Sequence, residues 1–95
     1  MLHVIAHIKA KREHADAVRA VLIGFVAPTR GEAGCVVYDL FQHLDDPARF
    51  TFVEEWTDKA ALDAHSRSAH ITSGRAALKD LVEGPAEIVL YSRLA

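Results

Sequence analysis

The sequence predicts an α+β fold in which helices cover one face of an antiparallel sheet. Three observations lead to this prediction. Four segments alternate apolar and polar side chains or are rich in β-branched and aromatic residues, which is typical of strands. The segments between them carry apolar residues at helical spacing. The chain has 95 residues, 51% hydrophobic and 25% charged, so we expect a single domain over residues 1–95.

The first strand and the first helix are predicted within the opening third of the chain. Over Leu2–Lys9 every second side chain is apolar, which is the period of a strand with one buried face. From about Lys11 to Val26 apolar residues recur at helical spacing. Pro28 and the glycines that follow it are expected to end this helix.

A hairpin is predicted next. The segments Cys35–His43 and Arg49–Trp56 are rich in β-branched and aromatic residues, as strands are. They are separated by Leu-Asp-Asp-Pro-Ala, in which Asp and Pro favour a turn. Two strands joined by so short a connection pair in the antiparallel direction.

The second helical region is predicted in two pieces. Thr57 or Asp58 can cap a helix that runs to about Arg67, and a second piece is expected from about 71 to 82. The break between the pieces is expected near Ser68.

A last strand is expected over Ala86–Leu94, after Gly84 and Pro85 end the helix. The complete order is β-α-β-β-α-β, the ferredoxin-like split βαβ arrangement.

Both faces of the predicted sheet carry apolar side chains. In the second strand Val37 and Phe41 point to one face, and Tyr38 and Leu40 point to the other. The helices can cover one face only, so we expect a homodimer in which a second copy covers the other. Coverage of that face by loops is the alternative.

Composition and charge argue against several classes of protein. The net charge is −2 and Lys and Arg are scattered, so the sequence shows no basic patch that would bind nucleic acid. No apolar run approaches the roughly 18 residues of a membrane span, and no secretion signal is evident. The single cysteine, Cys35, allows no internal disulfide and fits a cytoplasmic protein.

Side chains that could take part in binding or catalysis are expected to converge between the sheet and the helices. Phe52, Glu54 and Trp56 share one side of the third strand. His65 lies three residues after Leu62, on or beside the buried stripe of the following helix. Each of these residues also has a purely structural explanation. Trp56 could fill the core, Glu54 could be a buried structural partner, and His65 could be a core histidine with satisfied hydrogen bonds.

Two motifs carry a resemblance to a known family. The run DDP-x2-F-x-F-x-E-x-W over Asp45–Trp56 is followed by A-L-x2-H-x2-S-x-H over Ala61–His70. Together with Gly34-Cys35 and Tyr38, this pattern resembles the signature of the antibiotic biosynthesis monooxygenase family, in its quinol monooxygenase branch. The resemblance implies a dimeric α+β barrel of ferredoxin-like subunits. It also implies that O2 oxidises a phenol or quinol without flavin, haem or metal.

The resemblance also suggests roles for individual residues. Such a reaction needs a base that removes a phenolic proton, because the anion gives an electron to triplet oxygen more readily than the phenol does. His65 is the best suited base. The residues expected to contact the substrate are Trp56, Phe52 and Tyr38 as pocket walls, Glu54 as a pocket acid, and Ser68 or His70 as hydrogen-bond partners.

Neither a cofactor nor a metal is expected. His65 and His70 are five residues apart, about 140° around a helix, and His3 and His7 lie roughly 13 Å apart along a strand, so neither pair chelates one ion by itself. The chain also contains no asparagine, whereas the haem-degrading and polyketide-oxidising branches of the family rely on a pocket Asn. The phenol-oxidising activity therefore remains the prediction, but only as a class of reaction.

Two other functions share this fold. The segment Arg49–Val53 is similar to the aromatic strand of RNA-binding modules, but Glu54, Glu55 and the negative net charge oppose that function. A dimeric small-molecule binding protein or isomerase is the second alternative, since fold does not determine function. Product formation without oxygen would distinguish an isomerase from an oxygenase.

Overall fold

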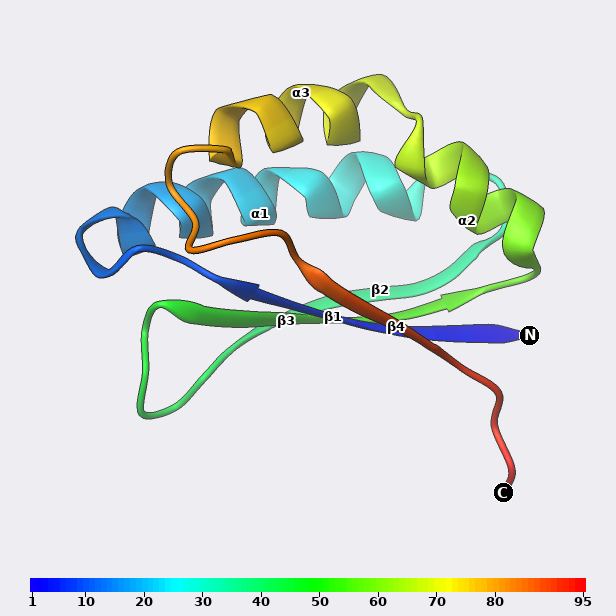
Figure 1. The fold of residues 1–95 in the computed structure, drawn as a ribbon. Helices are drawn as coiled ribbons and strands as arrows, with labels where there is room; N and C mark the ends of the chain where they lie inside the picture. The colour runs from blue at the N-terminus through cyan, green and yellow to red at the C-terminus, as the bar shows by residue number, and fades with distance from the viewer.

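The structure is a computed structural model that describes all 95 residues. It contains one four-stranded antiparallel sheet with strand order β2-β3-β1-β4, and all helices lie on one face of it (Figure 1). The strands are β1 (Leu2–Lys9), β2 (Cys35–Gln42), β3 (Arg49–Trp56) and β4 (Glu87–Tyr91). The helices are the short 3-10 helix η1 (Arg12–His14), α1 (Ala15–Arg30), α2 (Lys59–Ser66) and α3 (Ala69–Leu78). The predicted ferredoxin-like α+β fold and element order are confirmed.

The main differences from the predicted element ends concern α1, α3 and β4. Pro28 does not end α1 but lies inside its last turn, and the helix continues to Arg30. Burial of Phe25 and Thr29 on this part of α1 holds the turn against the sheet, which offsets the hydrogen bond that a proline cannot donate. The helix α3 ends at Leu78 rather than near residue 82, and β4 covers Glu87–Tyr91 rather than 86–94.

The register of the sheet decides which side chains meet the helices. Glu54 of β3 lies opposite Tyr38 of β2 and Val4 of β1, and Phe52 lies opposite Leu40 and Ala6. Alternate residues of β3, from Phe50 to Trp56, are buried on this helix-covered face. The predicted grouping of Phe52, Glu54 and Trp56 on one side of the strand is therefore confirmed.

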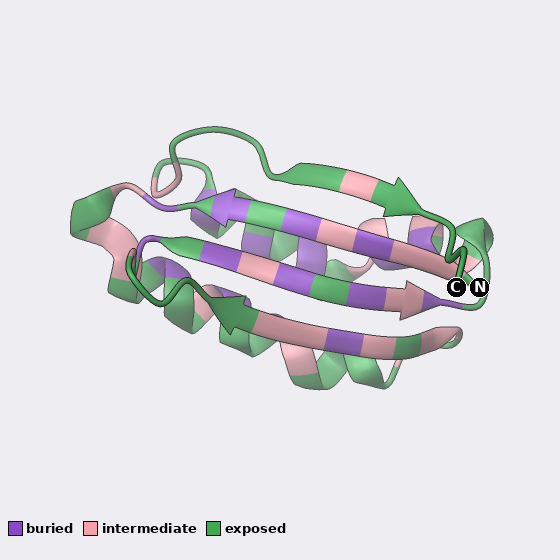
Figure 2. Cartoon of the chain, turned by 90° about the horizontal axis from the view of Figure 1, so that it is seen from below, coloured by how far each residue is buried: buried purple, intermediate pink, exposed green.

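The opposite face of the sheet is open in the single chain, and burial alternates along its two central strands, β1 and β3 (Figure 2). Ile5 lies at its centre, opposite Val53 on one side and Val89 on the other. Phe41 and Tyr91 are about half exposed, at 56% and 49%. This face thus presents apolar side chains to solvent, although His3, His7 and Glu55 alternate with them.

The break between α2 and α3 positions two histidines. Asp58 caps α2 by accepting a hydrogen bond from the amide of Ala61. The helix ends at Ser66, and Ser68, in an extended conformation, precedes α3. The predicted break near Ser68 is confirmed, and it places His65 and His70 on separate helices.

Two glycines allow close approaches around this region. A Cβ atom on Gly74 would lie 2.0 Å from Cε1 of Phe25, so a larger residue would push α3 away from α1. Gly34 has a φ of +83°, and its Cβ would lie 2.5 Å from that of Ala61. The turn between α1 and β2 therefore fits closely against α2.

None of the helices has the length and apolar character that crossing a membrane would require.

Candidate active site

Four of the predicted site residues form an aromatic cluster between the sheet and the helices. The ring of Tyr38 stacks on that of Phe52 at a centroid distance of 4.7 Å. The imidazole of His65 lies 4.8 Å from the indole of Trp56 and 5.5 Å from the Tyr38 ring. The cluster joins β2 and β3 to α2, and each of its four residues is at most 7% exposed.

His65 is paired with a carboxylate that the sequence analysis did not single out. Its Nδ1 atom lies 2.6 Å from Oε2 of Glu32, a residue of the turn between α1 and β2. A carboxylate accepts only, so Nδ1 carries the hydrogen and donates it to Glu32. This arrangement leaves Nε2 of the neutral ring with a lone pair.

The remaining ring nitrogen of His65 is accessible. The hydrogen bond to Glu32 uses Nδ1 and leaves Nε2 without a partner. No fully buried side-chain nitrogen or oxygen in the structure lacks a hydrogen bond, so Nε2 keeps at least a small contact with solvent. A proton can therefore arrive at Nε2 although the side chain of His65 is only 8% exposed.

The surroundings of His65 favour the neutral ring. Burial lowers its pKa, and the hydrogen bond and negative charge of Glu32 oppose this effect. His70 and Arg75 add smaller effects that also lower the pKa. The neutral ring is the form that can accept a proton.

Glu54 and Trp56 form a buried pair on the sheet side of the cluster. The indole Nε1–H of Trp56 donates to Oε1 of Glu54 over 2.9 Å, while Glu54 is 5% exposed and Trp56 fully buried. Burial raises the pKa of Glu54, and the hydrogen bond from Trp56 opposes the shift. Burial and the negative charge of Glu54 also raise the pKa of Tyr38, so Tyr38 keeps its proton at neutral pH.

The hydroxyl of Ser68 and one ring nitrogen of His70 are engaged within the protein. The hydroxyl of Ser68 donates to the carbonyl of His65 over 2.7 Å and thereby binds an end of α2. Nε2 of His70 lies 2.9 Å from Oγ1 of Thr29, a fully buried residue of α1. A substrate oxygen would have to replace these partners, so the predicted contacts of Ser68 and His70 stay predictions.

His65 and His70 lie closer together than the predicted angle of about 140° around a helix implies. They do not lie on one continuous helix, because the chain breaks between them, and their ring centroids are 6.1 Å apart. One ligand atom from each of Glu32, His65 and His70 lies within 4.8 Å of the others.

Glu32 and Thr29 are the residues that sequence reasoning missed. They lie 33 and 41 positions before the histidines that they contact. Glu32 belongs to a glycine-bounded turn, Gly31 to Gly34, and an acidic residue in such a turn is common without any function. The local signal was too weak to connect it with His65.

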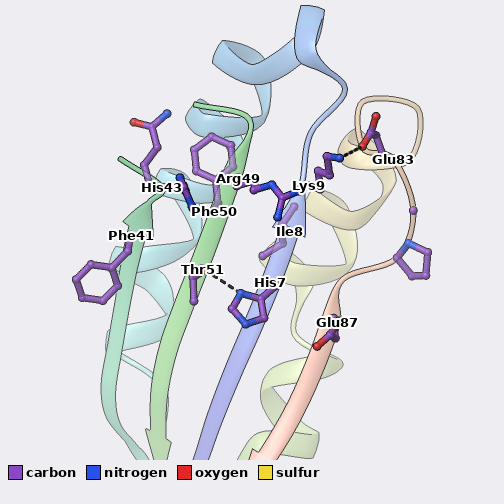
Figure 3. A pocket seen from close by; sticks show the side chains of 13 residues that line it. His7, Ile8, Lys9, Phe41, His43, Arg49, Phe50, Thr51, Glu83 and Glu87 are labelled. Carbon is purple, nitrogen blue, oxygen red and sulfur yellow. Dashed lines mark hydrogen bonds and ion pairs between the residues drawn. The ribbon is translucent and has the colours of Figure 1, made fainter. Parts of the chain in front are cut away.

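Two cavities lie away from the aromatic cluster. One, of about 680 Å³, opens where β3, β1 and β4 approach the 43–48 turn and the loop before β4, and its wall includes His7, Arg49 and Glu87 (Figure 3). The other, of about 660 Å³, lies between α3 and β4 and includes Leu78 and Ile88. Neither is lined by a residue of the cluster.

Comparison with known proteins gives the family. The sequence profile described as antibiotic biosynthesis monooxygenase matches residues 1–77. The chain belongs to this family. The Bacillus subtilis protein named "Putative monooxygenase YcnE" is 32% identical over 89 residues, which are 94% of this chain and 94% of that protein. The Mycobacterium tuberculosis protein named "Putative monooxygenase Rv0793" is 33% identical over 91 residues, 96% of this chain and 89% of that protein. The chain spans 60% of another relative, sll1783 of Synechocystis, at 32% identity.

Solved structures of the family share this fold. PA3566 of Pseudomonas aeruginosa superposes with a TM-score of 0.94 at 38% identity, covering 99% of this chain and 94% of that one. A crystal structure described as an antibiotic biosynthesis monooxygenase gives a TM-score of 0.94 at 37% identity over the whole of both chains. The family assignment and the ferredoxin-like fold are thus confirmed together.

Proposed function

We propose that this protein is a cofactor-independent monooxygenase that oxidises a phenolic or quinol-type aromatic molecule with O2. The observation that carries the proposal is the pair His65 and Glu32, which leaves a basic and accessible nitrogen beside an aromatic cluster. Membership of the monooxygenase family supports the same chemistry.

The pair suits the removal of a phenolic proton. Nε2 of His65 accepts the proton, and the carboxylate of Glu32, 2.6 Å from Nδ1, stabilises the imidazolium that forms. The phenolate transfers an electron to O2 more readily than the phenol, and the surrounding aromatic side chains keep water away from the radical pair. Burial lowers the pKa of His65, so the ring is ready to accept a proton at neutral pH.

The overall reaction balances without an external reductant. A phenol with a hydrogen on the reacting ring carbon takes up one oxygen atom there and becomes a quinone. The second oxygen atom leaves as water with the ring hydrogen and the phenolic hydrogen. The substrate supplies all four electrons that O2 accepts, so His65 only has to move protons.

A substrate ring needs space that the closed cluster does not offer. Trp56 and Tyr38 are buried at 0% and 3% exposure. We propose that the ring enters from the solvent-accessible side of His65 and displaces an aromatic side chain of the cluster. Trp56 and Phe52 would then stack on the substrate.

We also propose a homodimer in the cytoplasm. The apolar centre of the open face, where Ile5 meets Val53 and Val89, supports a second copy as its cover. The single cysteine Cys35, which allows no internal disulfide, supports a reducing compartment.

An oxygen-electrode screen of hydroquinones, naphthoquinols and anthrone-like phenols tests the proposed function. We expect at least one of these compounds to give protein-dependent oxygen uptake, which stops under anaerobic conditions and persists after treatment with a chelator. Turnover of a compound in the absence of O2 would instead favour an isomerase. No uptake with any electron-rich phenol would contradict the proposal.

A further inference from the structure

We infer that Glu32, His65 and His70 form a binding site for a divalent transition-metal ion of the zinc class. One ligand atom from each residue lies within 4.8 Å of the other two. The three residues come from different elements, namely the turn after α1, helix α2 and helix α3. The helix break at residues 67–68 is what brings the two imidazoles together.

The chemistry of the three side chains matches such an ion. Two imidazoles and one carboxylate are a ligand set that zinc uses, with a water in the open fourth position. Ligand atoms of a tetrahedral zinc ion lie about 3.3 Å apart, given metal–ligand distances of about 2.0 Å. His65 and Glu32 are already closer than this, at 2.6 Å. The ligand atom of His70 has to move closer, because the three ligand atoms span up to 4.8 Å and Nε2 of His70 is bonded to Thr29.

Access and charge also permit binding. The side chain of Glu32 is 19% exposed, so an ion can arrive from solvent beside it. Arg75 is the opposing cation near His65, but its guanidinium is exposed and donates to the carbonyl of Ser66. The carboxylate of Glu32 supplies the negative charge of the site.

Metal binding would stop the proposed reaction, a consequence that rests on the proposed function. A neutral imidazole carries one hydrogen. If the metal takes Nδ1 of His65, this hydrogen moves to Nε2, which then has no lone pair to accept a proton. The same histidine can therefore serve as a base or as a metal ligand, but not as both at once, and zinc would act as an inhibitor.

Competition with a chromogenic chelator measures the affinity for Zn2+ and needs no substrate. The variants are Glu32→Gln and His70→Gln, with His43→Gln as a control because His43 is exposed in the hairpin turn between β2 and β3. Circular dichroism confirms that each variant is folded. We expect each of the two site variants to bind Zn2+ at least tenfold more weakly, since loss of even an outer-shell partner costs about 10–100-fold. The control should stay within twofold of the wild type.

Cobalt supplies a second readout, because Co2+ bound to a tetrahedral site absorbs strongly in the visible range. We expect this absorption in the wild type and its loss in His70→Gln. Equal Zn2+ affinity in the wild type and His70→Gln, or no binding at all, would overturn the site.

Oxygen uptake then separates the metal site from the proposed function. We expect Zn2+ to inhibit the wild type with a midpoint equal to the dissociation constant of Zn2+. The rate of His70→Gln is compared with its own zinc-free rate, and we expect its inhibition to need at least tenfold more Zn2+. Binding at the three residues without inhibition would support the metal site and contradict the role of His65 as base.

Discussion

Nδ1 of His65 lies 2.6 Å from Oε2 of Glu32, although the two residues are 33 positions apart in the chain. The contact orients the imidazole so that its free nitrogen faces accessible space. It is the geometry that a general base needs when a carboxylate fixes its tautomer.

Glu32→Gln should lower kcat by on the order of tenfold or more while leaving KM nearly unchanged. The amide oxygen of Gln can still accept the Nδ1 hydrogen, but it no longer stabilises the imidazolium by charge. Steady-state oxygen uptake separates the two constants. Loss of activity that follows the loss of folded protein, with kcat per folded molecule unchanged, would show that Glu32 is only structural.

Glu54→Gln should change how stability depends on pH. Burial raises the pKa of Glu54 in the folded state above the ordinary value of 4.5, so its favourable contribution is present below pH 4.5 and is lost as the pH rises through the folded pKa. The variant should therefore equal or exceed the wild type in unfolding free energy at pH 7, by up to about 1 kcal/mol, and fall below it at acidic pH. Urea denaturation at pH 4 and pH 7 measures both differences. If the unfolding free energy of the wild type increases relative to that of the variant as the pH rises, the explanation is refuted.

Trp56→Phe should cost stability as well as substrate affinity. The variant removes the Nε1–H that donates to Glu54, so a buried carboxyl oxygen loses its partner at a cost of about 1–3 kcal/mol. The cost should be smaller in a Glu54→Gln background, because an unpaired amide is less costly to bury than a carboxylate. Denaturation of the four proteins of this double-mutant cycle gives the coupling, and strictly additive effects would argue against the pair.

The fold was predictable from the sequence because each element has its own local signal. The alternation of apolar and polar side chains over Leu2–Lys9 predicted β1, and the β-branched and aromatic residues of the hairpin predicted β2 and β3. The structure confirms all three strands. The prediction for Pro28 failed because tertiary burial of Phe25 and Thr29 outweighs a local helix-ending tendency.

The site was predictable only in part. The period of β3 placed Glu54 and Trp56 together, and spacing placed His65 on the buried side of α2. The partner Glu32 was not predictable, because its contact with His65 depends on how the turn after α1 packs against α2. The short distance between His70 and His65 depends likewise on the helix break, because a continuous helix would hold these two residues apart.

Val53→Lys should yield a monomer if a second copy covers the open face. Val53 lies between Ile5 and Asp39 on this face. Asp39 already pairs with Arg30, so a lysine buried there in the interface would cost more than it gains. Ile23→Lys is the matched control, because Ile23 is 48% exposed on α1 and lies away from the sheet. Light scattering at micromolar concentration should report a dimer for the wild type and the control, and a monomeric wild type would contradict the proposed assembly.

Oxygen uptake by His65→Gln, measured together with its unfolding free energy, tests the role of His65 most directly. The amide of Gln can still donate to Glu32, so stability should change by no more than about 1 kcal/mol. Loss of the base should lower turnover by on the order of a hundredfold or more. Full turnover in a folded His65→Gln protein would contradict the account.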